Sequence, residues 1–188
     1  MGRIVVSDNV SIDGVFQDPA GDEDFPRGGW VGLIKDRPEL SRLALEEALS
    51  AEAMLMGRRT YEWFVARWPT RTGELADRLN SMPKYVVSSV LDQPTWNNAT
   101  VLKGDLLEAV ARLKSEVTGE IVVPASAGIV RALVEHEIVE ELRLKVFPIV
   151  LGAGERIFGE TTGMKAMRLV DVRILDGDTA SLTYERVV

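Results

Sequence analysis

Cysteine is absent from the 188-residue chain, and histidine occurs only once. Without cysteine there is neither a disulfide framework nor a thiolate metal site, and one histidine excludes a multi-histidine metal centre within a single chain. No run approaches the roughly 20 apolar residues of a membrane span. The N-terminal residues also lack the cationic and apolar regions of a signal peptide. These absences predict a cytoplasmic protein with no membrane partner and no metal centre.

Clusters of positive charge are missing as well. The net charge is −7, and the longest run of basic residues is the pair Arg58 and Arg59. Proteins that bind nucleic acid usually carry a basic face, so we expect no nucleic-acid partner. The composition, 46% hydrophobic and 27% charged, is that of an ordinary globular protein. The length suits one domain spanning residues 1–188.

Hydrophobic patterning indicates strands of two kinds. Short continuous apolar runs, which are typical of strands buried on both faces, occur at residues 4–6, 53–56, 85–87 and 121–123. Nearer the C-terminus, apolar residues alternate with polar ones at residues 142–146, 170–174 and 180–184. The sequence Asp176-Gly177-Asp178 lies between the last two segments and predicts a hairpin turn.

Helical patterns separate the early strands. Capping residues start helices at Asp36, Asp105 and Ser126, and a further helix is expected near Thr60. The alternation of strand and helix predicts an α/β fold. We expect a mixed, mostly parallel sheet of about eight strands, with about four helices on its two faces and a C-terminal antiparallel hairpin.

Small and polar residues follow three of the predicted strands. They are Gly57, Arg58, Arg59 and Thr60 after one strand, Ser88 and Ser89 after the next, and Ala125, Ser126, Ala127 and Gly128 after a third. In open α/β sheets, ligands bind at the carboxyl ends of strands, where helix N-termini offer free N–H groups to phosphate. Guanidinium and hydroxyl groups also donate hydrogen bonds to phosphate oxygens. Together the three segments predict a site for a nucleotide with several phosphates, although each one alone is more typical of an ordinary turn or cap.

Two smaller features have two interpretations each. Asp13, in the sequence Ser-Ile-Asp-Gly, is either a general acid whose pKa is raised by burial or an aspartate that only shapes a turn. Gly152 and Gly154 belong either to a loop that contacts phosphate or to a plain turn after a strand. A long loop rich in glycine, proline and acidic residues, at residues 18–32, is of the kind that often carries function.

Longer strings of the sequence resemble one known family. LMGRRTYEWF resembles the segment of dihydrofolate reductases in which Gly-Arg-x-Thr ends a strand and meets the 2′-phosphate of NADPH, and KYVVSS follows at the family's spacing. SIDGVFQDP and LVEHEIVEELRLKVFPIVLGAGERIF resemble segments of the reductase domain of riboflavin biosynthesis. The chain is thus similar over nearly its whole length to the dihydrofolate-reductase-like family, RibD C-terminal type, which implies a three-layer α/β/α fold.

The resemblance implies a reductase that uses NADPH and transfers hydride to a C=N or C=O of a pteridine- or pyrimidine-like small molecule. The residues that it places against the cofactor are Gly57, Arg58, Arg59, Thr60, Ser88, Ser89, the turn at residues 125–128, Gly152 and Gly154. It places Asp13 and the loop at residues 18–32 beside the substrate, and it implies a homodimer. Pro124-Ala125 departs from the family's Gly-Gly, and a positive φ there would be costly for alanine.

Two alternatives remain beside this hypothesis. The first is the riboflavin-pathway reduction of a ribosylamino-pyrimidine, which needs a basic pocket where Arg27, Arg67 and Arg71 could converge. The second is a non-catalytic nucleotide-binding module that retains the fold. The absence of a clear acid on the first long helix favours the second, because Glu46 and Glu47 have the pattern of a solvated face.

Overall fold

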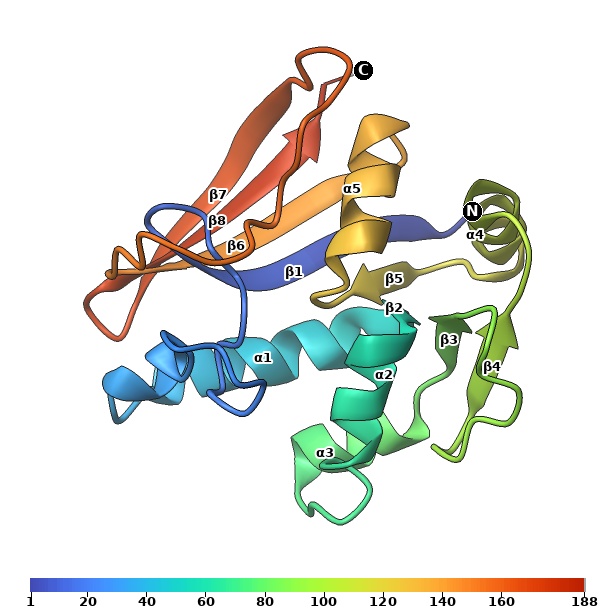
Figure 1. Cartoon of the computed structure of the whole chain (residues 1–188), viewed down its shortest axis with the longest axis horizontal. Helices are drawn as coiled ribbons and strands as arrows, with labels where there is room; N and C mark the ends of the chain where they lie inside the picture. Colours follow the sequence, from blue (N-terminus) through green and yellow to red (C-terminus); the bar gives the residue numbers. More distant parts are fainter. Residues whose placement is uncertain (188) are drawn as a thin grey trace.

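A computed structural model describes residues 1–187 of the chain. The strands are β1 (Arg3–Ser11), β2 (Ala51–Gly57), β3 (Lys84–Val87), β4 (Ala99–Leu102), β5 (Glu120–Val123), β6 (Glu141–Phe147), β7 (Met167–Leu175) and β8 (Thr179–Arg186). The helices are the 3-10 helix η1 (Trp30–Leu33) and the α-helices α1 (Pro38–Ser50), α2 (Arg58–Val65), α3 (Glu74–Ser81), α4 (Leu106–Glu116) and α5 (Ala127–Glu135). Figure 1 shows their arrangement. None of the described helices is long and apolar enough to cross a membrane.

All eight strands form one mixed sheet in the order β4-β3-β2-β5-β1-β6-β8-β7. The pairs from β4 to β6 are parallel, and β8 pairs antiparallel with β6 and with β7. This confirms the predicted mostly parallel sheet with an antiparallel hairpin at its C-terminal end. The hydrophobic pattern located seven of the eight strands. The strand that it did not locate is β4, a short edge strand without a strong apolar signal.

Two apolar clusters cover the two faces of the sheet and make the fold three-layered. One cluster joins the even-numbered residues of β1, such as Ile4 and Val6, to α4 and α5. The other joins Met54 and Met56 of β2 to α1, α2 and α3. Helices therefore lie on both faces, as Figure 1 shows. The predicted α/β/α architecture is confirmed.

The helix starts differ in part from the prediction. Asp105 caps α4 as expected, because its carboxylate accepts the N–H of Glu108. The prediction of a capping box that starts at Asp36 is wrong, because no side chain at the N-cap of α1 accepts a hydrogen bond from the helix. The free N–H groups of α1, at Glu39 and Leu40, donate instead to the carboxylate of Asp176 in the turn between β7 and β8. A residue distant in sequence supplies the cap, which local spacing cannot reveal.

The prediction of about four helices omitted α3. Its eight residues carry a weak apolar pattern, with only Ala76 and Leu79 buried. Two buried residues in eight are too few to define a helical stripe in the sequence.

Candidate functional site

A cavity of about 530 Å³ opens at the carboxyl ends of β1, β2 and β5. The cavity exists because β5 and β6, the two neighbours of β1, pair with it over different lengths. The pairing of β1 with β5 stops at Val6 and Val123, whereas its pairing with β6 continues to Ser11 and Phe147. The last residues of β1 therefore have no strand on one side, and the chain after β5 turns away into α5. This gap is the kind of position at which ligands bind in open α/β sheets.

Two of the three predicted phosphate-binding segments meet at this cavity. The predicted residues that line it are Gly57, Arg58, Arg59, Thr60, Ala125, Ser126, Ala127 and Gly128. The hydroxyl of Ser126 joins the two segments, since it accepts the N–H of Gly57 at 3.1 Å and donates to Thr60 Oγ1 at 2.9 Å. The side chain of Ser126 was expected to cap α5, but its hydroxyl forms these two hydrogen bonds instead of a cap.

Both helices that begin at the cavity start without a side-chain cap in the described chain. They are α2, which follows Gly57, and α5, which follows Ser126. The first N–H groups of a helix have no partner within the helix and carry partial positive charge. A Cβ built on Gly128 would meet nothing within 4 Å, and one on Gly57 would come no closer than 3.8 Å to Ile129. The backbone is thus open to an anionic ligand at both helix starts.

The turn before α5 contains two non-glycine residues with a positive φ, a backbone conformation that usually favours glycine. Ala125 has a φ of 47° and Ser126 a φ of 58°. Left-handed conformations of this kind cost non-glycine residues roughly 1–2 kcal/mol each. The strain that the sequence predicted for Ala125 is therefore present, and the turn keeps its shape in spite of it.

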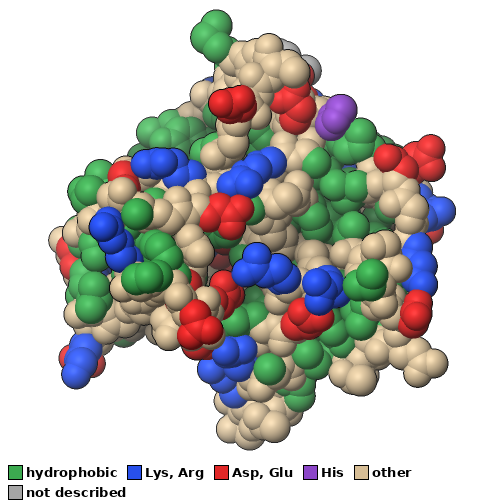
Figure 2. All heavy atoms as spheres, in the orientation of Figure 1, with side chains coloured by type: hydrophobic (Ala, Val, Ile, Leu, Met, Phe, Trp, Pro, Cys, Tyr) green, Lys and Arg blue, Asp and Glu red, His purple; other side chains and the backbone are tan. Residues whose placement is uncertain are grey.

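The two arginines lie at the rim of the cavity and are paired with acidic residues. Arg58 forms an ion pair with Glu62 at 2.7 Å, and Arg59 lies 3.9 Å from Glu23 with 80% of its side chain exposed. Figure 2 shows basic and acidic side chains interspersed on this face of the molecule. Surface pairs of this kind contribute little to stability, so both guanidinium groups can exchange their partners for a phosphate.

The remaining predicted cofactor residues do not line this cavity. Ser88 uses its hydroxyl to accept the N–H groups of Val90 and Leu91, and Ser89 is exposed. Gly152 donates its N–H to Asp13. Gly154 has a φ of 115°, and a Cβ there would come within 2.7 Å of Val15. The contacts of the two glycines suit a role in shaping their loop, and the part of all four residues in cofactor binding stays a prediction.

Asp13 has the contacts of a structural carboxylate, which favours the second of its two interpretations, and a catalytic part for it stays a prediction. It accepts hydrogen bonds from the Ser11 hydroxyl and from the N–H groups of Leu151 and Gly152, at 2.7–3.0 Å. The Ser11 hydroxyl is the main cause, with these two N–H groups, of a pKa of about 2 for Asp13. Its carboxylate stays ionised near neutrality and fastens the loop after β6 to the end of β1. Such a group has no proton to donate at neutral pH.

Asp8 is the acidic residue that the sequence analysis missed. It lies on β1 beside the gap, lines the cavity and is 9% exposed. Oδ1 accepts the N–H of Ala125 at 2.8 Å, while Oδ2 is buried and has no hydrogen-bond partner in the described chain. Burial raises the pKa of Asp8 to about 7. The available signal was an acidic residue between Val6 and Val10 on the inward-facing side of an apolar strand.

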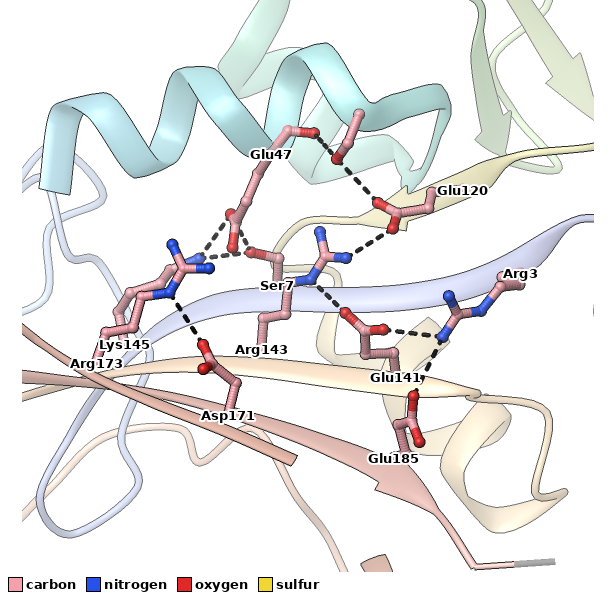
Figure 3. A network of polar contacts seen from close by, with 11 residues as sticks. Arg3, Ser7, Glu47, Glu120, Glu141, Arg143, Lys145, Asp171, Arg173 and Glu185 are labelled. Atoms are coloured by element: carbon pink, nitrogen blue, oxygen red, sulfur yellow. Dashed lines mark hydrogen bonds and ion pairs between the residues drawn. The ribbon is translucent and has the colours of Figure 1, made fainter. Parts of the chain in front are cut away.

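A second buried polar group reaches the cavity from the opposite face of the sheet. Lys145 of β6 donates to Ser7 of β1 and to Glu47 of α1, the latter at 3.1 Å (Figure 3). Only 14% of the Glu47 side chain is exposed, against 53% for Glu46. The interpretation of these two residues as one solvated face is therefore wrong for Glu47, which faces the sheet. Ser7 and Lys145 both line the cavity.

The first part of the loop at residues 18–32 lines one side of the cavity, through Asp18, Pro19, Ala20, Asp22 and Glu23. Asp18 organises it by accepting the N–H groups of Gly21 and Asp22 at 2.8 Å. Asp22 in turn accepts hydrogen bonds from Trp63 of α2 and from Arg67, which follows that helix. The guanidinium of Arg67 lies 4.5 Å from the centre of the Trp63 ring. The loop is thus fastened across the cavity to α2.

The comparisons with known proteins agree with this architecture. The sequence matches the family model of the RibD C-terminal domain over residues 3–181. YyaP, a protein of Bacillus subtilis with no characterised function, is 23% identical over 191 residues, which cover 97% of this chain and 94% of YyaP.

Two solved structures of similar shape cover almost the whole chain. A candidate riboflavin biosynthesis protein of Shewanella sp. PV-4 has a TM-score of 0.78 at 20% identity, with 99% of both chains covered. Dihydrofolate reductase of Enterococcus faecalis, solved with NADP(H), has a TM-score of 0.64 at 14% identity, with 98% of this chain and 96% of that one covered. At these identities the likeness concerns the fold.

Proposed function

This chain belongs to the RibD C-terminal domain family, and we propose that it is a reductase that uses NADPH to reduce a C=N or C=O bond of a pteridine- or pyrimidine-like small molecule. The observation that carries the proposal is the meeting of α2 and α5 at one cavity. Two uncapped helix starts separated by one gap suit a ligand with phosphates at two places.

The residues at the cavity fit such a cofactor. The N–H groups at residues 125–128 would hold the pyrophosphate, and Arg58, Arg59 and Thr60 would hold the 2′-phosphate that distinguishes NADPH from NADH. Open space at the Cβ positions of Gly57 and Gly128 permits close approach. The cofactor supplies the hydride, and the chain supplies position and electrostatics.

The riboflavin-pathway reaction finds less support in the structure than the broader proposal. The three arginines considered for a ribose-phosphate pocket are engaged at separate places. Arg27 donates to the carbonyl of Leu151, Arg67 holds Asp22, and Arg71 stacks on Trp68 at 4.7 Å. The three arginines therefore do not converge on one pocket, and we favour a substrate without a phosphate group.

Titration with NADPH and with NADH, followed by tryptophan fluorescence, tests the cofactor. We expect NADPH to bind more tightly, and we expect the preference to shrink in Arg58→Ala and Arg59→Ala because a guanidinium–phosphate contact is lost. Arg112→Ala is the control, since Arg112 lies exposed on α4. Equal affinity for both nucleotides in the wild-type chain would contradict the assignment of the two arginines. Absence of binding of both nucleotides would contradict the cofactor proposal, and tight binding without consumption of NADPH with any substrate would favour the non-catalytic module.

We also infer that the chain forms a homodimer through β7. This edge strand exposes Leu169, Val170, Val172 and Ile174, each by 44–61%. An exposed nine-residue edge with apolar side chains is a surface on which another strand can pair. Light scattering after size exclusion should give the mass of two chains, and Val172→Arg should give one. A wild-type mass of one chain at micromolar concentration would contradict the inference.

A further inference from the structure

The carboxylate of Asp8 lies where an anionic ligand would be expected to bind. Its Oδ1 already accepts the N–H of Ala125, the first donor of the turn at residues 125–128. Its Oδ2 is buried and has no partner among residues 1–187, and Asp8 is one of the residues that line the same cavity. Buried carboxylate oxygens almost always have hydrogen-bond partners, so an orphaned one beside a cavity indicates a missing partner.

The turn itself has the properties of an anion site. The left-handed Ala125 and Ser126 bring successive N–H groups together, and such turns form concave anion-binding surfaces. The next N–H groups, of Ala127 and Gly128, belong to the first turn of α5 and lack partners within the helix. The chain's own carboxylate therefore lies in the turn that the proposed function assigns to a phosphate.

The charges that face Asp8 do not neutralise it. Lys145 approaches from β6, but its ammonium is shared with Glu47 of α1, and these two groups act on Asp8 in opposite directions. The other acidic residues that line the cavity are Asp18, Asp22, Glu23 and Glu155, and its other basic residues are Arg58 and Arg59 at the rim. Burial outweighs these contributions and raises the pKa of Asp8 to about 7.

We propose that Asp8 holds the anion position of the 125–128 turn in the unliganded protein, and that a phosphate-bearing nucleotide binds there together with one proton, which neutralises Asp8. The inference rests on the proposed function. Two negative groups that share one set of buried N–H donors cannot both stay charged without a large cost. Protonation removes this conflict and leaves a carboxylic acid beside the cavity, which is the form that can give a proton to a substrate.

The test is the pH dependence of nucleotide binding. NADPH and NADH are titrated from pH 6 to pH 9, and NADH serves because it has no 2′-phosphate that titrates in this range. We expect the dissociation constant of the wild-type chain to rise about tenfold per pH unit above about pH 7, as one linked proton requires. Calorimetry at pH 8 in buffers of different ionisation enthalpy should show uptake of about one proton per nucleotide.

Asp8→Asn separates charge from shape. The amide oxygen still accepts the Ala125 N–H, so we expect Asp8→Asn to fold, to bind with little pH dependence and no linked proton, and to bind more tightly than the wild-type chain at pH 9. Glu116→Gln, at an exposed position on α4, should behave as the wild-type chain. Asp8 enriched in ¹³C at its carboxyl group should titrate near pH 7 alone and at higher pH with nucleotide.

Each outcome bears on a different proposal. Tight binding without pH dependence in the wild-type chain would overturn the role of Asp8 and leave the reductase proposal standing. Equal loss of affinity in Asp8→Asn at pH 6 and pH 9 would show that Asp8 is a binding partner of the nucleotide and not its competitor. No binding to either chain at pH 6 would overturn both the cofactor assignment and this inference.

Discussion

Replacing Asp8 by asparagine should stabilise the unliganded protein at alkaline pH. The pKa of Asp8 is about 7 in the folded chain, against an ordinary value of 3.8 for an aspartate in the unfolded chain. Below pH 3.8 the residue is protonated in both states, so its ionisation costs nothing. Between the two values only the folded state keeps the proton, and stability falls by about 1.4 kcal/mol per pH unit as pH rises. Above pH 7 the loss is complete, at about 4 kcal/mol.

Asparagine has the same shape and no charge, so the difference between the two chains isolates this contribution. We expect equal stability near pH 4 and an advantage for Asp8→Asn of a few kcal/mol at pH 8, which corresponds to a rise in Tm of roughly 5–15 °C for a chain of this size. Denaturant unfolding of both chains from pH 4 to pH 9 measures it, with Glu116→Gln as control. Parallel stability curves for the wild-type chain and Asp8→Asn would refute the reasoning, because they would mean that Asp8 titrates alike in the folded and unfolded chains.

Three other substitutions test the fold around the site. Ala125→Gly should raise stability by about 1 kcal/mol, because glycine adopts a φ of 47° with little strain; an unchanged or lower Tm would contradict this. Asp176→Ala should destabilise the chain by about 1–2 kcal/mol in urea unfolding, since it removes the acceptor of two N–H groups of α1, whereas Asp178→Ala, in the same turn, leaves those two groups paired. Leu133→Ala should cost about 2–5 kcal/mol, because the side chain is fully buried between α5 and the sheet; the exposed Leu49→Ala should cost far less.

The strands that form the sheet were largely predictable because each carries its own signal. Runs such as Ile4-Val5-Val6 are apolar at every position, which is the pattern of a strand covered on both faces. The hairpin of β7 and β8 was predictable from alternation and from its turn. The short strand β4 and the helix α3 were not, since neither buries enough apolar side chains to leave a pattern.

The candidate site was predictable where its residues are consecutive. Gly57 to Thr60 and Ala125 to Gly128 follow apolar strands directly, and the sheet brings the two segments together. Ser126 illustrates the limit. Its position before a helix predicted a cap, yet its hydroxyl bonds to Gly57 and Thr60, which only the packing of β2 beside β5 makes neighbours.

The sequence by itself determined most of the order of strands and helices and the two segments predicted to bind phosphate, because these depend on neighbours along the chain. Only the tertiary structure decided which carboxyl group is ionised near neutral pH and which one keeps its proton. Asp13 binds N–H groups of a loop more than 130 residues away and stays ionised, while Asp8 is buried where β1 separates from β5 and keeps its proton to higher pH. The pKa of a carboxyl group depends on burial and on the donors around it, and the fold sets both.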